Sequence, residues 1–289
     1  MRSGVPYMAT SALFFSGMAA LVKLAGHRLP AEEIVLARAA VTLALSYAIV
    51  RRASLGWGTH KGRLLLRGVW GSAALFCYYV ALTRLPLAEA SVFHHTAPLF
   101  TAVLAWFLLG ERTGSRTAIA LALGLAGVLV VSRPAVLFGA STLDPTATAI
   151  ALAGAGFSAS ALVTVRSLSQ VEDPRVIVLY FPLVTLPLAI PWALRVWVWP
   201  TPLEWLELVG VGVCTQIAQL TMTEGLRRER ASRATAIGYL QVVFAVIWGG
   251  LFFGEVPAGL TAIGAALIVV STLLIAWKPS PVAADADDV

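Results

Sequence analysis

The sequence predicts an all-α integral membrane protein with ten transmembrane helices, arranged as two inverted repeats of five helices each. Three observations lead to this fold class: the composition, the spacing of the apolar stretches and an internal repeat. Of the 289 residues, 58% are hydrophobic and only 12% are charged, and the mean hydropathy is +0.83. A soluble domain carries about 25% charged residues, so this composition indicates helices that lie in a bilayer.

The apolar stretches are long enough to cross a membrane as helices. A spanning helix needs roughly 20 mostly apolar residues, and charged or Pro- and Gly-rich breaks separate ten such stretches. The predicted helices cover residues 5–26, 31–50, 64–82, 87–109, 115–132, 146–168, 174–195, 203–224, 231–253 and 257–277. Several connections contain only a few residues, so the helices that they join are expected to be antiparallel.

The positive charges predict the orientation of these helices. With ten helices, both termini lie on one side of the membrane. If that side is the cytoplasm, most of the 21 Lys and Arg residues fall in cytoplasmic loops, and only Lys23, Arg28, Arg84, Arg133 and Arg195 fall outside. Cytoplasmic loops carry an excess of Lys and Arg. We therefore expect a multi-pass protein of the cell (inner or plasma) membrane with cytoplasmic termini, and the net charge of +6 gives no reason to expect nucleic acid as a partner.

The second half of the chain repeats the first. The stretch "FLLGERTGSRTAIALALGL", from Phe107, aligns with "LFFGEVPAGLTAIGAALIV", from Leu251, and "IVLARAAVTLAL", from Ile34, aligns with "IVLYFPLVTLPL", from Ile177. Each copy holds five helices, an odd number, so the second copy crosses the membrane in the opposite sense. Many secondary transporters have this plan, with the substrate site near the midplane between the halves. We predict a first repeat over 1–132, a linker over 133–145, a second, inverted repeat over 146–277 and a disordered cytoplasmic tail over 278–289.

These stretches resemble a known transporter family. "LTRLPLAEASVFHHTAPLFTAVLAWFLLGERTGSRTAIALALGLAGVLVV", from Leu82, is similar to the EamA-type repeat of the drug/metabolite transporter superfamily, and Arg38 matches an arginine common in the second helix of that repeat. The resemblance covers nearly the whole chain and is weaker in the second copy. It implies ten helices in two inverted halves and the export of small metabolites. By overall similarity, the chain most resembles the aromatic amino-acid exporters of the YddG type.

Polar side chains inside the predicted helices are candidates for a substrate path, because at membrane depth they are costly unless they face the bundle interior or water. Ser72 and Tyr79 share one side of the third predicted helix, and Gln216 and Gln219 share one side of the eighth. The repeat places Gln216 over Ser72, so both copies turn the same face toward something polar. We expect a shared cavity between the repeats. The alternative is a set of hydrogen bonds between helices, each worth about 0.6 kcal/mol.

Aromatic side chains are candidates for the apolar part of recognition. Stacking holds a flat apolar ligand, and hydroxyl or amide groups bond its polar end. The aromatic candidates are Phe15, Tyr78, Tyr79, Tyr239 and Trp248, and Gln241 is the amide candidate beside them. The alternative for each of these rings is ordinary core packing.

His94 and His95 precede Pro98 at the head of an apolar run. Pro98 has no backbone N–H, which leaves the carbonyl of His94 without its helical donor. We therefore expect a kink beside the two imidazoles, and in the second copy Gly238 and Tyr239 occupy the matching positions. The alternatives are a histidine bonded to a neighbouring helix and a histidine near the lipid headgroups. Adjacent histidines point in different directions on a helix and no Cys or carboxylate completes a ligand set, so no metal site is predicted.

Arg38 is interpreted as the only cation well inside a predicted span. It is a candidate clamp for the carboxylate of an amino acid, but the resemblance implies a family position near a helix end, which favours a structural bond to backbone carbonyls or to a nearby acid. No Asp or Glu lies in the middle of a span, so the usual residue of a proton relay is missing, and His95 is the titratable group that could replace it.

The motifs exclude several function classes. The chain has no phosphate-binding loop and no GxGxxG, which excludes drive by ATP, and it has no GxSxG, HExxH or mid-span acid pair, so neither an enzyme nor a cofactor is expected. We predict a secondary transporter that exports aromatic and other apolar amino acids by alternating access. Its partners would be the small-molecule substrate and the lipid bilayer, with the monomer as the functional unit. The alternatives are an exporter of organic cations or other drugs, and a channel-like facilitator.

Overall fold

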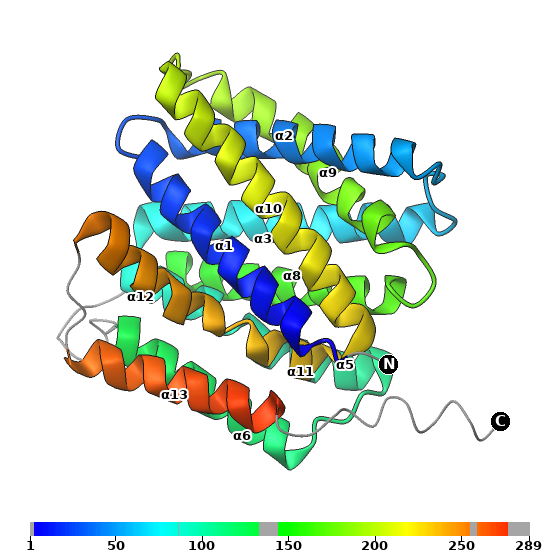
Figure 1. The fold of residues 1–289 in the computed structure, drawn as a ribbon, viewed down its shortest axis with the longest axis vertical. Helices are drawn as coiled ribbons and strands as arrows, with labels where there is room; N and C mark the ends of the chain where they lie inside the picture. The colour runs from blue at the N-terminus through cyan, green and yellow to red at the C-terminus, as the bar shows by residue number, and fades with distance from the viewer. Residues whose placement is uncertain (1–2, 86, 133–143, 255–258, 277–289) are drawn as a thin grey trace.

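The computed structural model describes residues 3–85, 87–132, 144–254 and 259–276, in which every regular element is an α-helix (Figure 1). The predicted tail, and the predicted linker apart from Asp144 and Pro145, lie outside these ranges. The helices, labelled as in Figure 1, are α1 (Val5–Ala25), α2 (Ala31–Arg52), α3 (Lys61–Arg84), α4 (Leu87–His94), α5 (Ala97–Leu109), α6 (Ser115–Ser132), α8 (Pro145–Leu168), α9 (Pro174–Ala193), α10 (Pro202–Arg228), α11 (Ala231–Ile237), α12 (Leu240–Phe253) and α13 (Gly259–Ala276).

Most helix ends lie within a few residues of the predicted ones, because capping residues in the local sequence mark where a helix starts or ends. Asp144, Asp173 and Thr201 accept a backbone N–H of the first helical turn at the starts of α8, α9 and α10. Gly110 and Gly254 end α5 and α12 in the left-handed conformation, with φ of 66° and 62°. The predicted helices 87–109 and 231–253 are each broken into two, which is described below with the site.

Seven helical segments in the described part of the chain are long and apolar enough to cross a membrane: Val5–Ala25, Ala31–Arg52, Lys61–Ala81, Val92–Leu109, Pro145–Leu168, Pro174–Ala193 and Ala231–Phe253. Two apolar helices, Ser115–Val131 and Gly259–Ile275, are shorter. The helix α10 is long enough, but it is outside this set because Gln216, Gln219 and its glutamates lower its hydropathy. The fold is thus that of a helical membrane protein, and the count of ten crossings stays a prediction.

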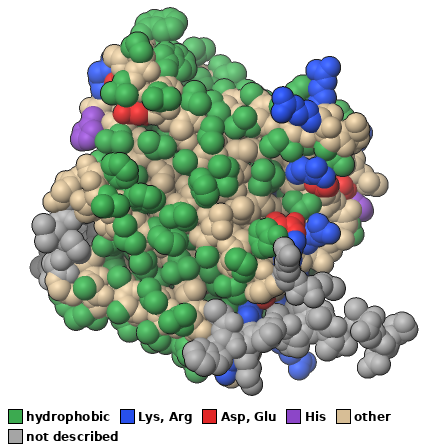
Figure 2. Space-filling model, in the orientation of Figure 1, with side chains coloured by type: hydrophobic (Ala, Val, Ile, Leu, Met, Phe, Trp, Pro, Cys, Tyr) green, Lys and Arg blue, Asp and Glu red, His purple; other side chains and the backbone are tan. Residues whose placement is uncertain are grey.

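The outer surface of the bundle is apolar. Large side chains such as Phe107, Leu108, Leu206 and Leu251 are more than half exposed. In Figure 2, hydrophobic side chains cover the middle of the visible face, and most Lys and Arg side chains on that face gather along the right-hand edge. A continuous apolar surface of this kind is expected where lipid is the solvent.

The two halves pack against each other as matched pairs of helices. The repeat pairs α1 with α8, α2 with α9, α3 with α10, α5 with α12 and α6 with α13. The contacts between the halves come in matched sets. The helix α1 packs on α10 and α12, and its counterpart α8 packs on α3 and α5. The helix α2 packs on α10, and its counterpart α9 packs on α3. The helices α2 and α9 contact each other, as do α6 and α13 at the opposite edge (Figure 1). A twofold relation between the halves would produce this exchange.

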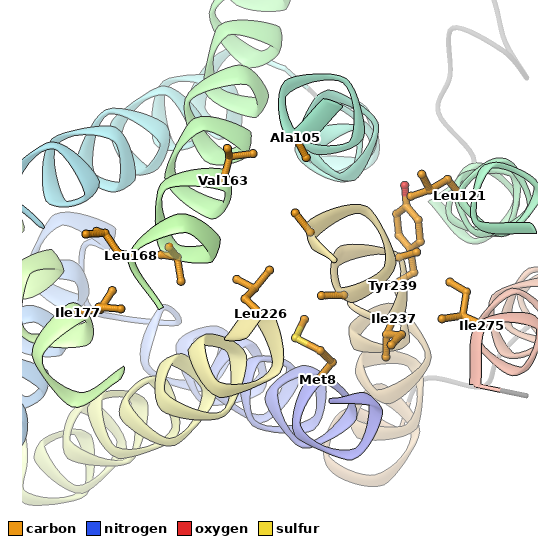
Figure 3. Packing of buried hydrophobic residues seen from close by; sticks show 14 of the residues in the cluster. Met8, Ala105, Leu121, Val163, Leu168, Ile177, Leu226, Ile237, Tyr239 and Ile275 are labelled. Carbon is orange, nitrogen blue, oxygen red and sulfur yellow. The ribbon is translucent and has the colours of Figure 1, made fainter. Parts of the chain in front are cut away.

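The main core cluster joins helices of both halves. Figure 3 shows Met8 of α1 beside Leu226 of α10, with Val163 and Leu168 of α8 on one side and Ile237 of α11 on the other. All five side chains are less than 5% exposed. The core that holds the bundle together is therefore an interface between the first and second halves.

The helices α6 and α13 approach so closely that glycine is required between them. A Cβ atom on Gly264 would lie 2.7 Å from the carbonyl oxygen of Gly127 and 3.0 Å from the backbone nitrogen of Val131. Backbone atoms cannot rotate away, so the helices would have to separate. Small residues allow this kind of close approach between helices in membranes.

We expect Gly264→Ala to lower the free energy of unfolding by about 1–3 kcal/mol, because a methyl group must enter a closely packed interface. Thermal unfolding of the purified protein in detergent would measure the change. The matched control is Gly17→Ala in α1, since an added Cβ atom there meets nothing within 4 Å. The control should be neutral or stabilising by up to about 1 kcal/mol, because alanine favours helix over glycine. Equal effects of the two substitutions would contradict the close approach.

Candidate functional site

Two helices break at equivalent positions of the two halves. The helix α4 ends at His94 and α5 begins at Ala97, while α11 ends at Ile237 and α12 begins at Leu240. Pro98 lies in the first turn of α5, where a missing N–H leaves no helical bond unmade. The structure therefore interrupts the first helix beside Pro98, where a kink was expected, and the second beside Gly238, which the repeat aligns with His94.

Four of the predicted site residues form a continuous row of rings beside these breaks. Tyr78 of α3 lies 4.6 Å from His94, measured between ring centroids. His94 meets His95 edge to face at 5.6 Å, and His95 stacks on Tyr239 at 6.4 Å with an interplanar angle of 24°. We call Tyr78, His94, His95 and Tyr239 the aromatic row. It begins in the first half and ends in the second.

The aromatic row is tightly packed in this conformation. A cavity of about 10 Å³ lies beside Tyr78 and His94, and its wall is completed by the small residues Ala81, Ala90, Ala151, Gly154 and Ala155. That volume holds roughly one water molecule. Tyr239 is 1% exposed and belongs to the core cluster shown in Figure 3. A substrate could enter here only after the halves move apart, so the predicted cavity is not open at this position.

The polar residues Ser72 and Gln216 bond neighbouring helices. The hydroxyl of Ser72 lies 2.9 Å from that of Thr185 in α9, and Ser46 of α2 donates to Oε1 of Gln216 at 2.9 Å. This is the alternative that the sequence left open for these two residues. The Nε2 atom of Gln216 is buried and has no hydrogen-bond partner in the described ranges, so its amide is only half satisfied there.

Among the described residues, the remaining aromatic candidates make no ring contact with the aromatic row. Trp248 donates from Nε1 to the hydroxyl of Ser16 at 3.0 Å, which links α12 to α1. Phe15 and Gln241 are partly buried. Within the described residues, the ring of Phe15 contacts no other ring, and the side chain of Gln241 forms no hydrogen bond. Tyr79 is near enough to Arg38 for an electrostatic interaction.

Two arginines converge on one phenylalanine of the second half. The guanidinium of Arg38 lies 5.8 Å from the ring centroid of Phe181 in α9, and that of Arg67 in α3 lies 4.8 Å from the same centroid. The hydrogen-bond partner of Arg38 is the sulfur of Met18, at 3.9 Å. The expected bond from Arg38 to a carbonyl or an acid is therefore absent among the described residues. Arg67 is 3% exposed and lies within α3. This corrects its assignment to a cytoplasmic loop, and Arg38 is not the only cation inside a predicted span.

Both ends of the bundle are closed by polar contacts between the halves. At the end that holds the α1–α2 connection, Arg28 binds Glu204 of α10 through both carboxylate oxygens, and Val198 donates its N–H to Glu33 at 3.0 Å. Thr201 donates its N–H and its hydroxyl to Oε2 of the same carboxylate, at 2.7 and 2.9 Å.

The opposite end holds a buried ion pair. Arg166 of α8 donates from Nε to Glu111 at 2.7 Å, and its Nη1 donates to the carbonyl oxygens of Leu226 and Arg227. The second oxygen of Glu111 accepts the N–H of Ala231 at 2.7 Å. At the same end, Glu172 accepts three hydrogen bonds from Thr59 and His60; they outweigh the effect of burial, and its pKa is lowered.

Comparison with known proteins bears on what this architecture does. Residues 2–133 and 146–277 each match the model of the EamA-like transporter family. The chain belongs to the EamA-like transporter family. This is a family of transporters, so the chain is a membrane transporter.

Two of the similar proteins are named for different cargo. The chain is 36% identical to the pseudopaline exporter CntI of Pseudomonas aeruginosa, over 95% of this chain and 96% of that protein. It is 30% identical to solute carrier family 35 member G1 of Mus musculus, over 93% and 77%, and 27% identical to a riboflavin transporter of Vibrio cholerae, over 95% and 93%. A crystal structure with 24% identity superposes with a TM-score of 0.81 over 94% and 95% of the two chains, which supports the fold.

Proposed function

We propose that this EamA-like transporter exports a small organic metabolite by alternating access, with aromatic and other apolar amino acids as its first candidate cargo. The observation that carries the proposal is the aromatic row, which joins the two halves beside the two helix breaks. Rings that line the surfaces of two moving halves can stack on a flat apolar group when the halves separate. The choice of aromatic amino acids follows the resemblance of the sequence to YddG-type exporters, whereas the relatives compared above carry other names.

The contacts at the two ends support an inverted arrangement of the halves. The α1–α2 connection meets the start of α10, through Arg28 and Glu204, at one end of the bundle. The corresponding connection of the second half, between α8 and α9, meets the α2–α3 connection through Glu172 and His60 at the other end. Equivalent connections thus lie at opposite ends, as two copies of opposite sense require. We place both termini in the cytoplasm and take the monomer as the transporting unit.

Alternating access requires that each end opens in turn. Opening one end breaks the bonds of Arg28 and Glu33 to the second half, and opening the other breaks the bonds of Glu111 and Glu172. In this structure both sets are intact and the aromatic row is packed, which corresponds to a closed state between the two openings. Rocking of the halves about the row is the motion that inverted-repeat transporters use.

Cargo cannot be taken from the relatives, because their names specify different molecules. One is named for pseudopaline and another for riboflavin. An organic cation is the second candidate, since an aromatic cage attracts cations. The guanidinium groups of the partly buried Arg38 and the buried Arg67 act against it, because they repel a positive charge in the same region.

Uptake of radiolabelled tryptophan, phenylalanine and lysine into liposomes that contain the purified protein tests the proposal, with and without a pH gradient. We expect saturable uptake of the two aromatic amino acids and none of lysine. His95→Ala should reduce the flux at least tenfold, because it interrupts the aromatic row, whereas the exposed His27→Ala should not. Flux that does not saturate would indicate a channel. Unchanged flux in His95→Ala would show that the histidines only pack the core. If neither tryptophan nor phenylalanine is taken up, aromatic amino acids are not the cargo.

A further inference from the structure

Arg67 is a buried cation whose hydrogen bonds are incomplete. Its Nη2 atom donates to Oε1 of Gln219 in α10 at 3.0 Å, and its guanidinium packs on Phe181. Its Nε atom is buried and has no hydrogen-bond partner among the described residues. No carboxylate of the described residues lies within the 4.0 Å of an ion pair from either Arg67 or Arg38. Within the part of the chain that the structure describes, two positive charges therefore converge on one ring without an ion-paired carboxylate.

The positions of Arg38 and Phe181 relate the two arginines to the interface between the halves. The repeat aligns Arg38 with Phe181, so the guanidinium of one half contacts the ring at the matching place of the other half. The helices that carry them, α2 and α9, pack on each other across the interface between the halves. Substrate sites of transporters with inverted repeats lie at that interface.

The backbone leaves space for the guanidinium of Arg67. A Cβ atom on Gly71 would lie 2.7 Å from Nη1 of Arg67 and 2.8 Å from the ring of Phe181. Glycine at this place in α3 is what allows the side chain and the ring to lie together. The arrangement is thus set by the chain and does not depend on a flexible side chain at a surface.

A buried charge without a counterion opposes folding, because removal of an ion from water costs several kcal/mol when no partner compensates it. Polar contacts with Gln219 and Phe181 compensate only part of that cost. An anionic ligand would supply what is missing, and guanidinium groups bind carboxylates through paired, charge-assisted hydrogen bonds.

We propose that Arg38 and Arg67 form a subsite for a carboxylate of the cargo, so that the transported molecule is an organic anion or a zwitterion. This inference rests on the transport function proposed above and adds the chemical class of the cargo. Gln219 positions Arg67 through its amide oxygen, and Phe181 packs against both guanidinium groups. The same subsite excludes amines that lack an acid group.

The test uses probes that differ in the charged group. Thermal unfolding of the purified full chain in detergent is measured with 3-phenylpropionate, with phenethylamine and with sodium chloride. We expect 3-phenylpropionate to raise the unfolding temperature by about 5 °C at a concentration of about 100 times its Kd, and the other two to leave it unchanged. An equal rise with chloride would overturn a carboxylate subsite in favour of an inorganic anion site, and a rise with phenethylamine alone would overturn the anion subsite.

Arg67→Met separates a binding role from a structural one. Methionine has a similar length and carries no charge, and the double variant Arg67→Met/Gln219→Leu also removes the amide that would be left unpaired. We expect both variants to be at least as stable as the unmodified protein, because a buried charge is replaced by apolar groups, and to lose the response to 3-phenylpropionate. Arg52→Met, at an exposed site, is the control for net charge and should keep that response. Strong destabilisation of both variants, or a retained response, would overturn the proposal.

Flux measurements distinguish failure of this inference from failure of the transport assignment. If liposomes carry no phenylalanine but 3-phenylpropionate stabilises the unmodified protein and not Arg67→Met, the subsite stands and amino-acid export is wrong. If phenylalanine is carried equally by the unmodified protein and by Arg67→Met, export stands and the subsite is wrong. If phenethylamine competes with phenylalanine as well as 3-phenylpropionate does, the carboxylate is not recognised and the subsite is again wrong.

Discussion

Arg166→Met is expected to lower the free energy of unfolding by about 3–5 kcal/mol, because it removes one partner of a buried ion pair. The substitution leaves Glu111 with only the N–H of Ala231, and it leaves the carbonyl oxygens of Leu226 and Arg227 without the guanidinium. Those contacts join the ends of α8 and α10 to the connection between α5 and α6. Thermal unfolding in detergent should show a decrease of roughly 10 °C.

Arg175→Met is the matched control for this loss. Arg175 forms an ion pair with Asp173, and the side chains of the two residues are 42% and 30% exposed, against 9% and 12% for Arg166 and Glu111. An exposed pair contributes about 0–1 kcal/mol, so the control should unfold within a few degrees of the unmodified protein. If the two variants were equally stable, the ion pair of Arg166 would have no special part in closing this end.

The helices of the fold could be predicted from hydropathy and from stop signals. The predicted limits of the first two helices, 5–26 and 31–50, lie close to the observed Val5–Ala25 and Ala31–Arg52, because loops with charges or turn residues separate the apolar stretches. The breaks within 87–109 and 231–253 are only partly visible in the sequence. Pro98 marks the first, whereas nothing beyond the repeat marks the second at Gly238.

The site could be predicted in part, because the repeat aligns residues that meet in the structure. His95 aligns with Tyr239, and the two rings stack. Arg67 was missed because every Lys and Arg near a helix end was counted as a loop charge, although it lies inside the predicted helix 64–82. The same alignment placed Phe181 opposite Arg38, and this contact could have been found from it.

The partners of the polar stripe could not be predicted. The sequence shows that Ser72 and Gln216 lie on equivalent faces, but a face can turn toward a cavity or toward another helix. Which of these occurs depends on where α2 and α9 lie, since they provide Ser46 and Thr185 as partners. Tertiary packing decides this, and the period of a single helix carries no information about it.

Tyr239→Phe should leave the fold intact and impair transport. The hydroxyl of Tyr239 is buried and has no hydrogen-bond partner in the described part of the chain, while the ring itself stacks on His95 and belongs to the core. Removal of an unsatisfied hydroxyl is expected to change the free energy of unfolding by 0 to about 1 kcal/mol in the stabilising direction. If the hydroxyl bonds the cargo once the halves separate, the uptake of phenylalanine into liposomes should decrease about tenfold, which corresponds to one lost hydrogen bond of about 1.4 kcal/mol.

Tyr180→Phe provides the opposite pattern as a control. Tyr180 is also buried, but its hydroxyl donates to the carbonyl oxygen of Trp57 at 2.7 Å at the end of the bundle. This substitution should lower the free energy of unfolding by about 1 kcal/mol and leave the flux unchanged. Loss of a hydroxyl that stabilises the fold should thus affect the free energy of unfolding, whereas loss of a hydroxyl that binds the cargo should affect the flux. Loss of stability without loss of flux in Tyr239→Phe would show that the second half of the aromatic row is only part of the core.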